Sequence, residues 1–120
     1  MQQRLAVDTS FLIFMVKRKI PMERVSEALN GPVILYTSQG VINELSLISR
    51  STRAAAGYAA LALKLASRLG IKIIPSYEKP DEWLLKQPFI ATVDIRLARA
   101  ARARGIRVIS ITKSNKIAVT

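Results

Sequence analysis

The sequence predicts a three-layer α/β domain, with a central, mostly parallel sheet of about five strands and helices on both faces. Short apolar segments rich in β-branched residues alternate along the chain with longer helical ones. This alternation is typical of parallel strands joined by helices. The strand segments are also apolar on consecutive positions, as expected of strands that helices cover on both faces.

The chain is expected to form a single domain over residues 1–120. Half of its 120 residues are hydrophobic and 22% are charged, a composition that excludes an intrinsically disordered chain and allows a real core. No repeat, linker or low-complexity segment divides the sequence.

Five apolar segments are predicted to be strands, each bounded by turn residues or by the start of a helix. The first lies within residues 4–10 and ends at Asp8, and the others are 33–37, 71–75, 89–92 and 106–111. The tail 113–120 leaves two alternatives open, an edge strand or a frayed end.

The segments between the strands are predicted to be helices. They cover residues 11–19, 21–29, 38–49, 53–70, 81–87 and 94–104. The helix at 53–70 is rich in alanine and apolar on nearly all sides. This pattern favours burial within the domain or against a second copy of it, and we therefore expect a homodimer.

The composition also limits the partners and the chemistry. The chain has 19 Lys and Arg against 8 Asp and Glu, a formal net charge of +11. Such a surface attracts polyanions, so nucleic acid is the first partner to expect and an anionic membrane surface the second. The absence of histidine and cysteine excludes serine–histidine and cysteine–histidine catalysis, zinc–thiolate sites and disulfides. An enzyme of this composition must use carboxylates, hydroxyls, lysines or a metal ion bound by oxygen.

No segment of the sequence predicts membrane attachment. The longest apolar stretch, residues 54–63, is shorter than the ~20 residues that a membrane span needs. Residues 11–16 are apolar but lack the cleavage site of a secretory signal. We therefore expect a cytoplasmic protein without a membrane partner.

Four of the eight acids are predicted to meet at one edge of the sheet. Asp8 closes the first strand, Glu44 lies in the helix after the second, Asp81 begins the helix after the third, and Asp94 follows the fourth. Sites of parallel sheets lie at the carboxyl ends of the strands. Clustered carboxylates repel one another and need protons or a cation. Their oxygens suit Mg²⁺ or Mn²⁺, and these ions support phosphodiester hydrolysis.

Each acid also has a purely structural alternative. Asp8 and Asp94 are placed to cap helices, Glu44 to lie on a solvated helix face, and Asp81 to favour a first helical turn. The helix after Asp94 carries arginines on one side, at Arg96, Arg99 and Arg102. These arginines are candidates for contacts with RNA phosphates, and a solvated helix face is the alternative.

Three segments of the chain resemble the signature segments of PIN-domain ribonucleases, a family that includes VapC-type toxins and endonucleases of ribosomal-RNA processing. The segments are VDTS at 7–10, VINEL at 41–45 and FIATVDIRLARAARARGIRVI at 89–109. They follow the family's order, and the resemblance extends over nearly the whole chain. It implies a PIN-like fold over residues 1–120 and an endoribonuclease that depends on Mg²⁺ or Mn²⁺.

Residue by residue, the resemblance implies that Asp8, Glu44, Asp81 and Asp94 bind the metal and that Ser10 and Thr92 orient these acids. It also implies two biological settings: a toxin held by an antitoxin protein, or a nuclease of RNA processing or decay. The segment from Asp81 to Asp94 is shorter than is common in the family. This departure leaves open an alternative, a catalytically silent RNA-binding or scaffold domain with the same fold.

Overall fold

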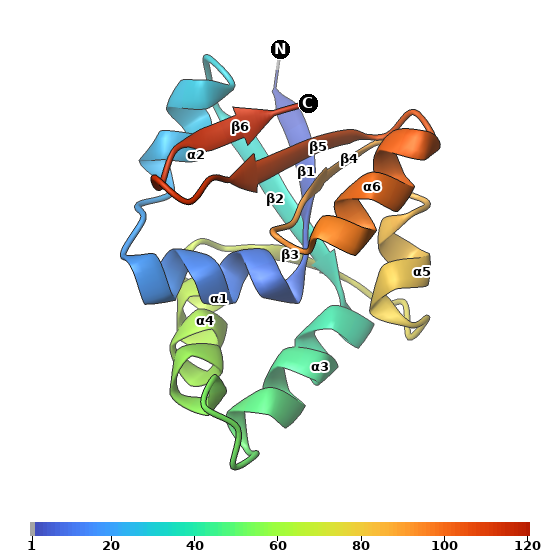
Figure 1. Ribbon diagram of the computed structural model, residues 1–120. Helices are drawn as coiled ribbons and strands as arrows, with labels where there is room; N and C mark the ends of the chain where they lie inside the picture. The colour runs from blue at the N-terminus through green and yellow to red at the C-terminus, as the bar shows by residue number, and fades with distance from the viewer. Residues whose placement is uncertain (1) are drawn as a thin grey trace.

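The computed structural model describes residues 2–120, which form a sheet with helices packed on both sides (Figure 1). The strands are β1 (Gln3–Val7), β2 (Val33–Ser38), β3 (Lys72–Ile74), β4 (Phe89–Ala91), β5 (Arg107–Ile111) and β6 (Ile117–Val119). The helices are α1 (Thr9–Arg18), α2 (Glu23–Ala28), α3 (Gln39–Ser49), α4 (Ala56–Arg68), α5 (Pro80–Leu84) and α6 (Ile95–Ala103). Within residues 2–120, no helix combines the length and the apolar character that crossing a membrane requires.

The order of the strands determines where a site can form. They lie in the order β3-β2-β1-β4-β5-β6, and all neighbours are parallel except β5 and β6. The chain therefore builds the sheet outward from β1 to β3, returns to place β4 on the other side of β1, and continues to β6. The order reverses between β1 and β4, and the helices that follow these two strands, α1 and α6, pack on opposite faces of the sheet. A crevice opens at the carboxyl ends of two such strands.

Side chains of β1 point alternately into two hydrophobic cores, one on each face of the sheet. Leu5 and Val7 pack in one core with side chains of α1, α2 and α4, whereas Ala6 packs in a second core with α5 and α6. Successive side chains of a strand point to opposite faces, so one strand contributes to both cores. Figure 1 shows α1 and α4 close together and apart from α5 and α6. The predicted three-layer α/β architecture is confirmed.

The structure corrects several predicted boundaries. The sheet has six strands because the tail forms β6 antiparallel to β5. Thr120 N–H donates to Val108 O at 2.8 Å, and Val108 N–H donates to Thr120 O at 2.9 Å. The helix predicted at 53–70 begins only at Ala56, because the chain turns just before it, and α5 is shorter than predicted.

The helix α4 is buried on one side only. Ala59, Ala62 and Ala66 are buried, and these small side chains let α4 pack closely against α1 and α3. On the outer side, Leu61 is 51% exposed and Tyr58 is 38% exposed. Within residues 2–120 the domain therefore buries only one side of α4. Burial of the other side against a second copy, and with it the homodimer, remains a prediction.

Candidate active site

Asp8 lies at the switch point between β1 and β4, and only 5% of it is exposed. Its N–H donates to Ala91 O of β4 at 2.9 Å, which holds the end of β1 against its neighbour. Asp8 occupies the N-cap position of α1, but its side chain makes no capping bond. Instead, Asp8 Oδ2 accepts hydrogen bonds from Ser10 Oγ at 2.7 Å and from Thr92 Oγ1 at 2.8 Å. The capping alternative is therefore wrong for this carboxylate.

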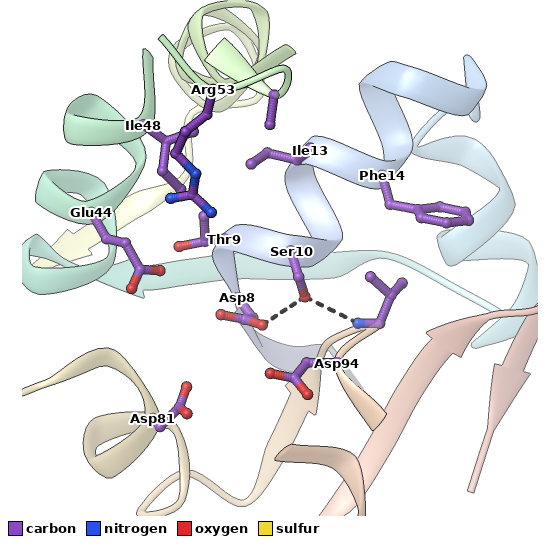
Figure 2. A pocket seen from close by; sticks show the side chains of 12 residues that line it. Asp8, Thr9, Ser10, Ile13, Phe14, Glu44, Ile48, Arg53, Asp81 and Asp94 are labelled. Carbon is purple, nitrogen blue, oxygen red and sulfur yellow. Dashed lines mark hydrogen bonds between the residues drawn. The ribbon is translucent and has the colours of Figure 1, made fainter. Parts of the chain in front are cut away.

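The same two hydroxyls also hold the loop after β4. Ser10 Oγ accepts a hydrogen bond from Val93 N–H at 3.2 Å, and Thr92 Oγ1 accepts one from Asp94 N–H at 3.0 Å. Figure 2 shows the bonds of Ser10 to Asp8 and to the loop. Because Thr92 is fully buried, this arrangement leaves the carboxylate of Asp8 little freedom to turn. Its other oxygen, Oδ1, has no hydrogen-bond partner within residues 2–120.

Asp94 combines the two alternatives that its position in the sequence left open. Its Oδ1 accepts hydrogen bonds from Arg96 N–H at 2.9 Å and Leu97 N–H at 3.4 Å, so it caps α6. Its Oδ2 makes no hydrogen bond to the described part of the chain, and the residue lines the same pocket as Asp8. One oxygen therefore fixes the side chain, and the other is available to a ligand.

The orientation of α3 about its own axis places Glu44 at the pocket. Ser38 begins this helix, and its Oγ accepts a hydrogen bond from Val41 N–H at 3.0 Å. Val41 and Leu45 are fully buried, and their positions leave Glu44 half-buried on the pocket side of the helix. Figure 2 shows its carboxylate directed toward Asp8.

Asp81 reaches the pocket because α5 approaches α3 closely. The loop before α5 lies on the first turn of α3, where Gly40 N–H donates to Ser76 O at 2.9 Å. A Cβ on Gly40 would lie only 2.6 Å from Glu78 O, so a larger residue would push the loop away. Trp83 of α5 is buried against the sheet and anchors the helix whose first turn carries Asp81.

The four acids line one open pocket of about 500 Å³ (Figure 2). Ile13, Phe14 and Ile48 form an apolar part of its wall. The structure therefore brings Asp8, Glu44, Asp81 and Asp94 together from four connections of the sheet.

The electrostatic environment favours protons or cations in this pocket. Burial raises the pKa of Asp8 above its ordinary value of 3.8, the hydrogen bonds from Ser10 and Thr92 lower it in part, and the charges of Asp81 and Glu44 raise it further. Desolvation also raises the pKa of Asp81, followed by the charges of Asp94 and Glu44. Each carboxylate thus makes ionisation of another more costly.

The donor set fits a hydrated divalent ion. All four acids offer carboxylate oxygens, the ligands that Mg²⁺ and Mn²⁺ prefer. In residues 2–120 no three acids lie close enough together to form a ready-made metal-binding group. Mg²⁺ commonly keeps several waters and binds through one or two carboxylates. The side chains therefore suit an ion that retains much of its water better than one that is fully enclosed.

The predicted RNA-contacting arginines lie outside the pocket. Arg96, Arg99 and Arg102 are exposed on α6, the helix that Asp94 caps. Arg102 Nε donates to Thr120 Oγ1 at 2.8 Å, so this arginine is engaged with the C-terminal residue. Arg96 and Arg99 extend the basic surface from the edge of the pocket, and their contact with RNA remains a prediction.

Two polar residues of the pocket, Thr9 and Arg53, were not predicted from the sequence. Thr9 stands inside the VDTS segment between two predicted site residues, and this position was the available signal. Arg53 gave no signal, because the sequence placed it inside a predicted helix. In the structure it lies in the turn between α3 and α4, and its guanidinium points into the pocket (Figure 2).

The fold is similar to that of known PIN domains. No protein-family model matches the sequence, and no curated protein matches it either. Among solved structures, the PIN domain endonuclease Utp24 matches with a TM-score of 0.81 at 23% sequence identity, over 97% of this chain and 90% of that one. A domain of a functionally unknown protein from Methanocaldococcus jannaschii DSM 2661 matches with a TM-score of 0.66 at 18% identity, over 92% of this chain and 91% of that one. The predicted PIN-like fold is confirmed.

Proposed function

We propose that this chain, which has the fold of PIN domains, is a metal-dependent endoribonuclease whose active site is the pocket at the β1–β4 switch point. One observation carries the proposal. Asp8 and Asp94 are each held by one carboxylate oxygen and leave the other without a hydrogen bond in the described chain, in a pocket that also contains Glu44 and Asp81. Utp24, which shares the fold, is a PIN domain endonuclease, and this similarity supports a nuclease activity.

The side chains of the pocket would have different roles in such an enzyme. Asp8 and Asp94 would hold a Mg²⁺ or Mn²⁺ ion with their unbonded oxygens, and Glu44 and Asp81 would add negative charge around it. Ser10 and Thr92 keep the carboxylate of Asp8 in one orientation. A divalent ion held there would supply Lewis-acid chemistry for hydrolysis of the phosphodiester. Since the chain contains no histidine, no imidazole is available to take the proton.

The basic surface supports RNA as the substrate. The net charge of +11 attracts the phosphate backbone over a distance. Arg96 and Arg99 follow Asp94 on α6 and are exposed, so a strand bound along this helix would enter the pocket at the cap. We further propose that the protein acts as a homodimer and either pairs with an antitoxin protein or works in RNA processing.

The test is cleavage of a mixed, structured RNA by the wild-type protein and by Asp8→Asn, each with EDTA, Mg²⁺ or Mn²⁺. Asparagine keeps the size of the side chain and an oxygen for Ser10 and Thr92, but removes the charge. Glu23→Gln is the matched control, because Glu23 is an exposed acid of α2 outside the pocket. We expect metal-dependent cleavage by the wild type and by Glu23→Gln, and a loss of roughly 100-fold or more in Asp8→Asn.

The competing function is the silent RNA-binding or scaffold domain. Its support is the segment from Asp81 to Asp94, which is shorter than is common among PIN-domain ribonucleases. It predicts tight RNA binding without cleavage in any of the three conditions, and binding that Asp8→Asn leaves unchanged. Cleavage that persists equally in wild type and Asp8→Asn would place the activity elsewhere.

A further inference from the structure

Arg53 is a cation in a pocket of acids, and it has no partner there. It lines the pocket together with Asp8, Glu44, Asp81 and Asp94. Within the described residues 2–120, its guanidinium makes neither an ion pair nor a hydrogen bond. Figure 2 shows it directed into the pocket on the side of Thr9 and Glu44. Five N–H donors are therefore available at this wall of the pocket.

The backbone of Arg53 is held in place although its side chain is not. Arg53 N–H donates to Ser51 Oγ at 3.2 Å, and Ser51 Oγ donates to Ile48 O at 2.7 Å. Arg53 O accepts a hydrogen bond from Ala56 N–H at 3.0 Å. The turn is thus bonded to the end of α3 and to the start of α4, and the guanidinium projects from a fixed base.

Thr9 is a second polar group of this wall without a partner in the described chain. It is 5% exposed and lines the same pocket, yet its Oγ1 has no hydrogen-bond partner in the described chain. A buried hydroxyl without a partner is costly, and native proteins satisfy nearly all such groups. An anion that accepts a hydrogen bond from Thr9 would remove this cost.

The N-terminus of α4 lies at the same wall of the pocket, and its electrostatic field favours an anion there. Ala55 lines the pocket and occupies the N-cap position of this 13-residue helix, where no side chain makes a capping bond. The N-terminus of a helix carries a partial positive charge and unsatisfied N–H groups, both of which favour an anion.

We propose that Arg53 and Thr9 form an anion-binding wall of the pocket, on the side where Glu44 also lies, and that this wall binds a backbone phosphate of the RNA. The inference rests on the proposed function, since it assigns the substrate's phosphate to one side of the same site. The guanidinium fork matches two phosphate oxygens, and the hydroxyl of Thr9 donates to a phosphate oxygen. The acidic side chains alone would repel such a group, so this wall explains how a phosphate enters a pocket of acids.

The first arm of the test measures kcat and KM for RNA cleavage. Arg53→Ala is expected to lower kcat/KM by roughly 100-fold, and Arg53→Lys is expected to recover part of the loss, because lysine keeps the charge without the fork. Thr9→Val should lower kcat/KM roughly 10-fold while Tm stays the same or rises, since it removes an unpartnered buried hydroxyl. Arg68→Ala is the matched control, because Arg68 lies exposed at the opposite end of α4.

The second arm measures binding of a fluorescent single-stranded RNA in EDTA, at several salt concentrations. Loss of one phosphate contact reduces the slope of log K against log salt by about 0.7 for single strands. We expect this reduction in Arg53→Ala, no reduction in Arg68→Ala, and weaker binding with an unchanged slope in Thr9→Val.

The two arms separate the possible failures. If the wild type cleaves RNA and Arg53→Ala cleaves as well as Arg68→Ala, the nuclease stands and the anion-binding wall is overturned. If the wild type does not cleave, the proposed function fails and the second arm decides: a reduced slope in Arg53→Ala supports the wall, and equal slopes in the two arginine variants overturn it.

Discussion

Thr92 donates a hydrogen bond of 2.8 Å to Asp8 across 84 positions of the sequence. The bond joins the ends of β1 and β4, the two strands between which the strand order reverses. Thr92 accepts a hydrogen bond from Asp94 N–H with the same oxygen, so one hydroxyl positions two acids of the pocket.

Thr92→Val should lower the stability of the protein and should lower RNA cleavage more than a comparable substitution outside the pocket does. The change removes the bond to Asp8 and the acceptor for Asp94 N–H, and we expect a loss of about 2 kcal/mol in the free energy of unfolding. Thr37→Val is the control, because Thr37 is equally buried in β2 but bonds only to a backbone oxygen of Val7. Urea unfolding and RNA cleavage, measured for both variants, check the prediction. Equal losses of activity in the two variants would contradict it.

Asp8→Asn should stabilise the protein in EDTA at neutral pH, by about 1 kcal/mol. The pKa of Asp8 is raised by burial and by nearby acids, so the folded state holds its proton more tightly than the unfolded chain does. The charged form therefore costs stability at neutral pH. This cost disappears as the pH falls through the raised pKa toward 3.8. Urea unfolding at neutral pH and near pH 4 measures the difference, which should be largest at neutral pH. A variant that is less stable than the wild type at neutral pH would show that the charge is already compensated.

Substitutions at Asp94 should separate its two roles. Asn caps helices about as well as Asp, so Asp94→Asn should keep the stability and lose the cleavage. Asp94→Ala removes the cap as well and should lose an additional ~1 kcal/mol. Circular dichroism during thermal unfolding, together with the RNA cleavage assay, distinguishes the variants. Full activity in Asp94→Asn would show that Asp94 serves only as a cap.

Divalent ions should stabilise the wild-type protein without any RNA present. An ion that binds only the folded state at 100 times its Kd adds about 2.7 kcal/mol, which appears as a rise in Tm. The rise should occur with Mg²⁺ or Mn²⁺, persist in Glu23→Gln, and be absent in Asp8→Asn. Differential scanning fluorimetry with and without EDTA measures it. An equal rise in Asp8→Asn would place the bound ion away from this pocket.

The exposed arginines of α6 should contribute to RNA affinity but not to stability. Replacement of both Arg96 and Arg99 by Ala is expected to reduce the salt slope of single-strand binding by about 1.4, or 0.7 for each phosphate contact. Tm should change little, because both side chains are exposed. Arg68→Ala serves again as the control. An unchanged slope in the double variant would identify these arginines as a solvated helix face.

Much of the fold and part of the site could be predicted from local patterns. Apolar runs located β1 to β5, and helical spacing located the helices to within a few residues. Asp8 and Asp94 were placed at strand ends because a parallel sheet gathers its carboxyl ends at one edge. These inferences succeed because alternation in strands and periodicity in helices relate residues that are close in the sequence.

Other features depend on contacts between distant segments. The sequence left the tail undecided, and it became β6 because β5 offered a free edge to pair with. Arg53 entered the pocket only because the chain turns before Ala56, between two helices that pack against each other. The sequence by itself determined β1 to β5, the approximate positions of the helices, and which end of the sheet collects the acids. The tertiary structure decided that Thr92 joins Ser10 on one oxygen of Asp8 and that the other oxygen is left for a ligand, because no local pattern links Asp8 to a residue 84 positions away.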